Sequence, residues 1–416
     1  MSKLGKKEPR MDTDEHGCDF LEKLLDGAEV EWVALGEVAT FLKGKSLPKK
    51  SIVEEGVHKC IHYGELFTYY PAIIKDVKSR TSQSITDSIV SLSNDVLMPT
   101  SDVTPTGLAV ASCIREDNIV LGGDILVIRS SAIDGRFLST FIRNNKSKIM
   151  QMVKGATVYH IYAKDLAKLS IPIPCPENPE KSLAIQAEIV RILDTFTELT
   201  TELTAELTAR KKQYNYYRDQ LLTFEEGDLE WKTLGELAKN LDSKRKPITA
   251  GSREPGEIPY YGASGIVDYV KGFIFDGDYL LVSEDGANLL ARSTPIAFSI
   301  HGKTWVNNHA HVLEFETYAE RKYIEYYLSN IDLTPYISGA AQPKLNKKNL
   351  NSIRIPNPSI EEKKRTVAIL DKFDTLTHSI SEGLPREIEL RQKQYEYYRD
   401  LLLNFPKPEP QTEIVA

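Results

Sequence analysis

The chain has 416 residues, enough for two or three domains, and its composition of 41% hydrophobic and 27% charged residues is ordinary for a globular protein. The longest apolar runs are far short of a membrane span, no signal peptide is recognisable, and four cysteines without close pairing predict reduced thiols and a cytoplasmic location. The formal charge of −7 argues mildly against a nucleic-acid binder, although a basic face can exist on an acidic chain.

The N-terminal part of the chain contains one half of an internal repeat. Residues 1–19 are polar and predict a disordered tail. In the segment that follows, residues 20–38, the pattern Glu-Trp-x-x-Leu-Gly-Glu occupies residues 31–37, and it recurs at residues 230–236, just after a long helical stretch. The segment missing after a second such stretch is therefore found at the start of the chain. This circular repeat predicts two similar halves with approximate two-fold symmetry and termini near each other.

Two inserts follow a common plan. In the first, residues 39–175, β-branched runs at residues 118–121 and 124–128 are bounded by turn residues, as strands are, and residues 137–152 predict a helix. The second, residues 239–357, has glycine-rich strand turns and a helix near residues 318–330. Both end in a Gly-Ala … Leu-x-x-Leu/Ile-x-Ile-Pro exit, at residues 155–172 and 339–356, which align without a gap. Because the inserts differ elsewhere, they have the pattern expected of two readers of different ligands.

Residues 182–224 predict one long helix. Apolar residues recur there at steps of three, four or seven, without Gly or Pro, and Pro176 and Pro179 stand before it as breakers. At 1.5 Å per residue this helix would span roughly 60 Å. Residues 359–405 repeat its Ile-Leu-Asp-x-Phe and Lys-Gln-Tyr-x-Tyr-Tyr-Arg-Asp motifs, with a capping box at Ser359 and a kink expected at Gly383. The apolar faces of these two segments predict an antiparallel pair of long coiled-coil helices, followed by a C-terminal tail at 406–416.

A tetrapeptide array lies inside the first long helix. Thr-Glu-Leu-Thr occupies residues 197–200 and 201–204, and Ala-Glu-Leu-Thr occupies residues 205–208. Each unit would lengthen the helix by ~6 Å and turn it by ~40°. Because Thr is a mediocre helix former, propensity does not explain the array, and we interpret it as a ruler; the alternative is repeat slippage tolerated on an exposed helix. The candidate ruler residues are Thr197, Leu199, Leu203 and Leu207.

The sequence contains no recognisable catalytic site. It has no phosphate-binding loop, no dinucleotide-binding glycine pattern, no nucleophile elbow and no Asn/Asp-Pro-Pro-aromatic tetrad of an amino-methyltransferase. His58, Cys60 and His62 would lie on one face of a strand, but alternate residues of one strand give poor tetrahedral geometry, and no second ligand cluster lies nearby. We therefore expect no catalytic residue, no metal and no cofactor in this chain.

Three other charged groups have structural interpretations that compete with functional ones. The acidic pair Glu284-Asp285 precedes a glycine, where turn chemistry is commoner than acid–base catalysis. His309 and His311 form either a structural pair or a DNA contact. The basic tracts at residues 211–212 and 391–393 are interpreted as charge on a solvated helix face.

Basic and aromatic residues gather in both inserts. Positive loops suit phosphates, and Arg, Lys, Asn and Gln suit base edges, although an ordinary solvated surface would explain many of these residues taken singly. In the first insert the candidate DNA-binding residues are Lys43, Lys45, Lys49, Lys50, Tyr63 and Arg80. In the second they are Lys244, Arg245, Lys246, Arg253, Tyr261, Lys303, His309, Gln342 and Lys344.

The order of these motifs resembles that of the specificity subunits of type I restriction–modification enzymes. The resemblance covers nearly the whole chain beyond residue 20. It rests on the paired Gln-Tyr-x-Tyr-Tyr-Arg-Asp helices, the Gly-Ala-Ala-Gln-Pro-Lys-Leu motif at 339–345, the two exits and the circular segments. The array resembles the tetrapeptide repeats of one subgroup, in which copy number is tied to spacer length. One departure is Val158-Tyr159, where the second half has Gln342-Pro343, which implies that this loop contacts DNA differently in the two halves.

The resemblance implies an α+β fold with two α/β target-recognition domains, residues 39–175 and 239–357, separated by the antiparallel helices. Each domain would read one half of a bipartite double-stranded DNA target. Helices in the central conserved region, 176–238, and the distal conserved region, 358–405, would set the spacer. Two methyltransferase subunits would dock on these helices, for which the candidate residues are Tyr214, Tyr217, Tyr395 and Tyr398.

The resemblance also implies where the chemistry takes place. Two motor–nuclease subunits would complete the enzyme, and S-adenosylmethionine, ATP and Mg would be bound by the partner subunits. This chain would itself be non-catalytic. A competing hypothesis is a coiled-coil scaffold that docks two protein partners without binding DNA. An autonomous methyltransferase or nuclease is disfavoured, because no cofactor-binding or metal-binding motif is visible.

Overall fold

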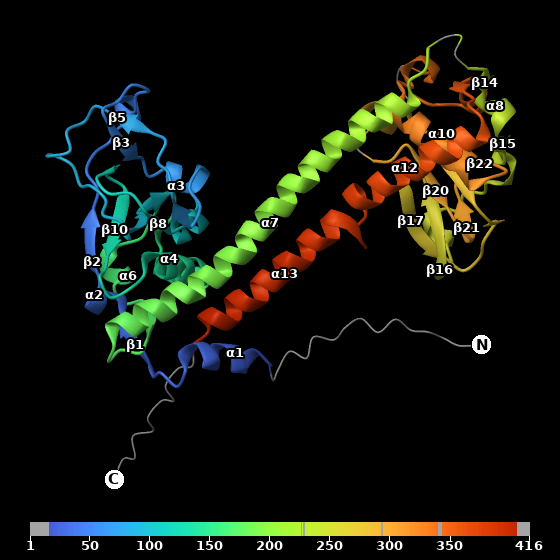
Figure 1. The fold of residues 1–416 in the computed structure, drawn as a ribbon. Helices are drawn as coiled ribbons and strands as arrows, with labels where there is room; N and C mark the ends of the chain where they lie inside the picture. The colour runs from blue at the N-terminus through green and yellow to red at the C-terminus, as the bar shows by residue number, and fades with distance from the viewer. Residues whose placement is uncertain (1–15, 226, 228, 293, 340–342, 406–416) are drawn as a thin grey trace. The chain divides into compact units, whose positions relative to one another are not determined.

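The computed structural model describes residues 16–405 apart from 226, 228, 293 and 340–342 (Figure 1). It divides into two compact units: unit 1 comprises residues 1–202 and 389–416, and unit 2 comprises residues 203–388. Helix α1 (His16–Leu25) shows that the predicted disordered tail is wrong over residues 16–19, since these residues start a helix. Residues 1–15 and the tail 406–416 lie outside the described residues. None of the helices in the described ranges is both long and apolar enough to cross a membrane.

Unit 1 is built on a five-stranded sheet with the strand order β2-β10-β6-β8-β4. Its strands are β2 (Thr40–Lys43), β10 (Ile125–Arg129), β6 (Val96–Pro99), β8 (Ser112–Ile114) and β4 (Ile73–Ile74). Two three-stranded sheets adjoin it: β5 (Arg80–Thr81), β3 (His58–Ile61) and β9 (Val120–Leu121); and β11 (Lys154–Gly155), β12 (Tyr159–His160) and β7 (Ser101–Asp102). The predicted helix 137–152 is two helices, α4 (Gly135–Asn144) and α5 (Lys146–Met152), because Asn145 leaves the helical conformation.

Unit 2 repeats much of this plan. Its main sheet has the order β15-β22-β19-β20, with strands β15 (Lys239–Asn240), β22 (Ala310–Glu314), β19 (Tyr279–Ser283) and β20 (Ala297–Ile300). Its second sheet consists of β17 (Gly265–Val270), β16 (Pro255–Gly262), β21 (Lys303–Val306) and β18 (Phe275–Asp276). In each unit the second sheet contains a parallel pair, β3 with β9 and β16 with β21. Helix α10 (Tyr318–Asn330) has the predicted bounds and begins with a capping box at Thr317.

The circular repeat is confirmed by two matching strand pairs. Strand β1 (Val30–Ala34) pairs with β13 (Ser170–Pro174), and β14 (Trp231–Thr233) pairs with β23 (Arg354–Pro356). In both pairs the tryptophan lies opposite the exit proline, Trp32 opposite Pro172 and Trp231 opposite Pro356. The start of the chain therefore occupies in unit 1 the place that residues 231–233 occupy in unit 2. The described ends of the chain also meet, since α1 shares a hydrophobic core with Phe405.

The predicted long helices are confirmed. Helix α7 (Pro179–Leu222) runs without interruption for 44 residues, and Pro179 is its first residue, where a missing N–H costs nothing. The second predicted helix, residues 359–405, forms α12 (Ile360–His378), which starts with the capping box of Ser359, and α13 (Gly383–Leu403). The predicted kink is a break at residues 379–382, and Gly383 resumes the helix with a φ of +78°. Early residues of α7 pack against α13 in unit 1, and late ones against α12 in unit 2, as an antiparallel pair requires.

Candidate functional site

A short hairpin follows the sheet at the same place in both units. In unit 2, Ser338 and Lys344 exchange backbone hydrogen bonds of 2.9 and 2.8 Å, and the Leu345 N–H donates to the Glu284 carbonyl at 3.0 Å. In unit 1, Lys154 pairs with His160 in an antiparallel bridge, and the N–H of the next residue, Ile161, donates to the Thr100 carbonyl at 3.1 Å. Residues 154 and 160 in unit 1 therefore correspond to residues 338 and 344 in unit 2, and the predicted contact Gln342 lies outside the described residues.

A buried histidine fixes the hairpin of unit 2. His311 Nδ1 lies 2.6 Å from Asp242 Oδ2, and its Nε2 lies 2.6 Å from the carbonyl oxygen of Leu345. Burial acts to raise the pKa of Asp242, but its hydrogen bonds and charge interactions, first of all with His311, hold that pKa below its usual value. Each ring nitrogen of His311 therefore faces an acceptor, a carboxylate oxygen on one side and a carbonyl oxygen on the other. Of the two interpretations of the histidine pair, His311 fits the structural one.

The predicted cations of unit 2 are of two kinds. Two arginines are bonded within the fold: Arg245 donates to the Ala310 carbonyl at 2.8 Å and to Glu284 at 3.0 Å, and Arg253 bonds Asp268 at 3.0 Å and lies over the Tyr260 ring. The predicted lysines are more accessible, with Lys344 half-buried and 3.8 Å from Glu284. The exposed predicted lysines of this unit are Lys244, Lys246 and Lys303. Phosphate contacts are therefore expected from the lysines rather than from the arginines.

A cavity of about 360 Å³ lies beside Asp285, the residue that forms a β-bridge with Lys344 of the hairpin. It is lined by the β16–β17 turn and by Asp285, Asn307 and His309, and the last of these is exposed and 3.3 Å from Asp285. The side-chain oxygen Oδ1 of Asn307 accepts a hydrogen bond from the His309 N–H at 2.8 Å, while its side-chain nitrogen Nδ2 has no acceptor among the described residues. Two apolar side chains flank these polar groups, Ile266 at 47% and Val267 at 55% exposure. Donors, acceptors and a methyl-sized apolar surface are the groups that read base edges.

The sequence alone points to only one of those five lining side chains, His309. It favours a turn for Asp285, and it does not single out Asn307 or the two apolar residues of β17. A sequence clue exists in the Gly262–Gly265 turn, which stands between the aromatic pair Tyr260-Tyr261 and the β-branched pair Ile266-Val267 and predicts an exposed hairpin. Tyr261, a predicted contact, lies instead half-buried against Phe298 in the core of the unit.

The candidate DNA-binding residues of unit 1 also divide into side chains without an ion-pair partner and side chains that are bonded or packed within the fold. No carboxylate among the described residues lies within ion-pair distance of any of the predicted lysines Lys43, Lys45, Lys49 and Lys50, all of which are exposed on and after strand β2. Arg80, in contrast, donates to the carbonyls of Gly56 at 2.7 Å and Val57 at 3.3 Å. Tyr63 is half-buried between the rings of His62 and Phe67. The four lysines are the residues of this unit best placed to contact phosphate.

The alternating His58, Cys60 and His62 lie on and just after strand β3. Burial raises the pKa of the Cys60 thiol to about 11, which keeps it protonated, and burial lowers the pKa of His62. The Nδ1 atom of His62 accepts a hydrogen bond from the Gly64 N–H at 3.1 Å. In the described parts of the chain no three His, Cys, Asp or Glu residues are grouped as a metal site would need.

The four predicted docking tyrosines hold the long helices together. In unit 1 Tyr398 stacks on Phe196 with ring centroids 5.2 Å apart, and in unit 2 Tyr217 stacks on Phe373 at 5.7 Å. Tyr214 is buried, and Tyr395, its counterpart in the repeat, is half-buried; each has an arginine over its ring. Burial raises the pKa of Tyr214 to about 12 and also raises that of Tyr395. These tyrosines therefore form the seam between the helices, and a partner would meet more exposed neighbours such as Tyr216.

The whole tetrapeptide array lies within α7. Its leucines, Leu199, Leu203 and Leu207, are half-buried at four-residue spacing, and its threonines bond the helix itself. Thr197 donates to the Leu193 carbonyl at 3.1 Å, and Thr201 donates to the Thr197 carbonyl at 2.8 Å. The hydroxyls of Thr197 and Thr201 thus find acceptors in the preceding turn of the same helix. The boundary between the units, at residues 202 and 203, falls inside the array.

Comparison with known proteins gives a consistent result. A family model described as "Type I restriction modification DNA specificity domain" matches residues 28–210 and again residues 226–390. The specificity subunit of the Escherichia coli type I restriction enzyme EcoR124I/EcoR124II is 38% identical over 413 residues, which cover 94% of this chain and 98% of that protein. The EcoprrI specificity subunit, also from Escherichia coli, is 34% identical, and the match covers 87% of this chain and 92% of that protein.

Solved structures share the fold at lower identity. The S subunit of a type I restriction–modification system from M. genitalium matches with a TM-score of 0.54 and 18% identity, covering 92% of this chain and 98% of that one. A second chain, from a study of the assembly and conformational transition of the type I system, matches with a TM-score of 0.56 and 17% identity, covering 90% and 97%. The twofold match of the family model follows the repeat seen in the strand pairs.

Proposed function

The chain belongs to the family of type I restriction–modification DNA specificity proteins, and we propose that it is the sequence-specific DNA-recognition subunit of a type I restriction–modification complex. The observation that supports this most directly is the duplication. The two units share a sheet plan, an exit hairpin and a helix seam, yet they carry different polar side chains next to the hairpin. One frame with two different surfaces is what a reader of two unlike half-sites needs.

In this proposal each unit reads one half of a bipartite DNA target. The free lysines of unit 1 and the exposed lysines of unit 2 contact phosphates, which positions the chain without reading sequence. The cavity bounded by Asp285, Asn307 and His309 contacts base edges in unit 2. The acidic charge of the chain is compatible with this role if the partner subunits supply much of the positive surface around the duplex.

The long helices set the spacer between the half-sites and dock two methyltransferase subunits, and two motor–nuclease subunits complete the enzyme. The chain itself is non-catalytic and binds no cofactor, whereas S-adenosylmethionine, ATP and Mg are used by the partner subunits. We place the complex in the cytoplasm. Two observations support this part of the proposal: the uninterrupted α7, and the reduced, buried thiols of Cys60 and Cys113.

Methylome sequencing tests the proposal directly. A host that carries the cognate methyltransferase gene is sequenced with and without the gene for this chain. One bipartite adenine-methylated motif should appear only when the chain is present. An unchanged methylome, with the chain expressed and bound to its methyltransferase, would contradict the proposal.

A gel-shift assay separates the proposal from a scaffold that docks two proteins without DNA. The complex of this chain with its methyltransferase is titrated with a duplex containing the motif and with a scrambled duplex. The specific duplex should bind at least 10³-fold more tightly at physiological salt, which is the usual lower bound for sequence-specific proteins. Equal binding of both duplexes would favour the scaffold.

A further inference from the structure

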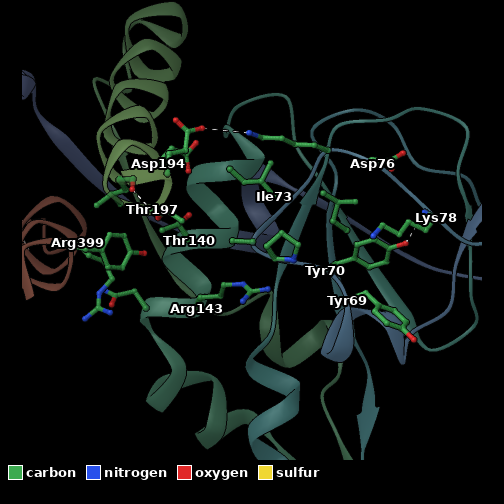
Figure 2. A pocket seen from close by; sticks show the side chains of 18 residues that line it. Tyr69, Tyr70, Ile73, Asp76, Lys78, Thr140, Arg143, Asp194, Thr197 and Arg399 are labelled. Atoms are coloured by element: carbon green, nitrogen blue, oxygen red, sulfur yellow. Dashed lines mark hydrogen bonds and ion pairs between the residues drawn. The ribbon is translucent and has the colours of Figure 1, made fainter. Parts of the chain in front are cut away.

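Unit 1 contains a cavity of about 600 Å³ between its recognition domain and the long helices (Figure 2). One wall is the segment 69–78, which contributes Tyr69, Tyr70 and Ile73. Helix α4 contributes Thr140, and helix α7 contributes Asp194. Helix α13 adds the half-buried Tyr395 and Arg399, so both long helices line the cavity. None of the lining residues is one of the proposed DNA contacts.

Asp194 is the group in this cavity that lacks a partner. It is half-buried, and no donor among the described residues lies within hydrogen-bond or ion-pair distance of its carboxylate. Burial raises its pKa above the usual value. The two nearby cations are used elsewhere: Arg136 binds Asp134 at 2.7 Å, and Lys75 lies 3.8 Å from Glu198. A desolvated carboxylate without a donor is costly, so a ligand that supplies one would gain binding energy.

The repeat shows what fills the equivalent place in unit 2. Asp194 belongs to the Ile-Leu-Asp-x-Phe motif of α7, and its counterpart in the same motif of α12 is Asp371. The carboxylate of Asp371 accepts hydrogen bonds from two tyrosine hydroxyls of α10, from Tyr318 at 2.8 Å and from Tyr326 at 2.6 Å. In unit 1 the corresponding helix α4 contains no tyrosine. The cavity is thus a place where one copy of the repeat holds tyrosine side chains and the other copy holds none.

The lining chemistry narrows the occupant further. A phosphate would have to approach Asp194 and Glu198, and the Arg399 guanidinium is already bonded to Asp400 at 2.8 Å. Arg143 is directed to the Ser112 hydroxyl. The fitting group has an apolar ring for the aromatic wall and one hydroxyl donor for the carboxylate, which describes a tyrosine side chain.

We propose that this cavity receives a tyrosine side chain of a partner subunit, whose hydroxyl donates to Asp194 as the hydroxyls of Tyr318 and Tyr326 donate to Asp371. The proposal rests on the proposed function in one respect, namely that the partner is a methyltransferase subunit of the complex. At one of the two docking positions, the partner's tyrosine would then make with Asp194 the contact that Tyr318 and Tyr326 of this chain make with Asp371 in unit 2. The two halves would then offer the methyltransferases unequal surfaces.

Filling the cavity from within tests the proposal. In Thr140→Tyr the new ring should occupy the space and present its hydroxyl to Asp194, and Thr140→Val is the matched control that changes the same position without filling it. Binding of the purified methyltransferase to the full chain is measured by isothermal titration calorimetry. We expect affinity at one of the two positions to fall at least tenfold in Thr140→Tyr and to stay within twofold of wild type in Thr140→Val.

A second variant keeps the test decisive if the larger side chain disturbs the fold. Asp194→Leu removes the acceptor but keeps an apolar body of similar size, and it should fold as well as wild type because the unpaired carboxylate is gone. It should weaken the same position by about tenfold. A Tyr→Phe scan of the methyltransferase should find one residue whose replacement has no further effect in Asp194→Leu, as a double-mutant cycle requires for a direct contact.

A small phenol distinguishes a partner side chain from a free ligand. p-Cresol should compete with the methyltransferase for wild type and should not bind Thr140→Tyr. Wild-type methyltransferase affinity in both Thr140→Tyr and Asp194→Leu would overturn the proposal, whether or not p-cresol binds. The proposed function is judged separately, by the methylated motif that the wild-type complex produces, so the two can fail independently.

Discussion

The two units share a frame but hold their hairpins by different means. Strand β22 pairs with β15 as β10 pairs with β2, and in this register His311 occupies the place of Leu126. Unit 1 fills that position and its neighbours on β10 with buried apolar side chains, whereas unit 2 holds an ion pair between His311 and Asp242. The apolar side chains of β10 stabilise unit 1 by packing alone. In unit 2, His311 also binds the carbonyl of Leu345 and thereby fixes the direction of the hairpin.

This difference separates what the repeat keeps the same from what it varies. The tryptophan lies opposite the proline in both strand pairs, and a phenylalanine stacks on a tyrosine in both units, at 5.2 and 5.7 Å. The polar groups near the hairpins do not recur. Stacked rings and strand registers therefore maintain the frame, and the polar side chains are free to change with the DNA half-site that each unit reads.

Shortening the helix that joins the units should have the largest effect, because it changes the methylated motif itself. Deletion of residues 201–204 removes one tetrapeptide and shortens α7 by ~6 Å, nearly two base pairs at 3.4 Å each. Methylome sequencing should show both half-sites unchanged and the spacer reduced by one or two base pairs. Altered half-sites would mean that the units do not read DNA independently of the helix.

Replacing His311 by the leucine of unit 1 should strongly destabilise unit 2. In His311→Leu the buried carboxylate of Asp242 loses its partner His311, and an unpaired buried charge costs about 3–5 kcal/mol. Chemical unfolding followed separately for the two units should show the loss in unit 2 only. Because folding lowers the pKa of Asp242 from the 3.8 of an ordinary aspartate, its stabilisation is fully present above pH 3.8 and is lost as the pH falls through the lowered pKa.

The double variant Asp242→Leu/His311→Leu is the control for that prediction. It removes both members of the buried polar pair and leaves neither without its partner, so most of the lost stability should return. The hairpin would still lack its bond to the Leu345 carbonyl. Recovery of stability without recovery of specific DNA binding would show that the pair of His311 and Asp242 positions the hairpin. Recovery of both would show that the pair only fills space in the core.

The sequence predicts the shared frame better than it predicts the sites. Periodicity and repeated motifs reveal α7, the antiparallel seam and the circular strand pairs, because each depends on local spacing or on a recurring motif. Whether Arg245 is available to bind DNA depends on its ion pair with Glu284, which lies 39 residues away in the sequence, and such an ion pair leaves no local sequence pattern. The same holds for Arg80 and for the unpaired Asp194, which is evident only when unit 2 shows which donors are missing.

The seam offers a prediction of intermediate size. Phe196→Ala and Phe373→Ala each remove a ring that stacks on a tyrosine in the other helix, and because both rings are only half-buried each should cost about 2 kcal/mol. Urea unfolding should give equal losses, each confined to the unit that contains the residue. Unequal losses would show that one copy of the repeat contributes more than the other to holding the helices together.

The smallest effects should separate positioning from reading. Lys49→Ala, in unit 1, removes a free cation and should weaken specific and scrambled duplexes alike, with the salt dependence of binding reduced by about one phosphate contact. Asn307→Ala, in unit 2, removes a free amide donor and should cost about 1–3 kcal/mol on the specific duplex alone, with relaxed choice at one base pair. Binding isotherms at several salt concentrations measure both. If Asn307→Ala also reduced the salt slope while Lys49→Ala changed base preference, the roles would be reversed, and the division of the two surfaces into phosphate and base contacts would have to be given up.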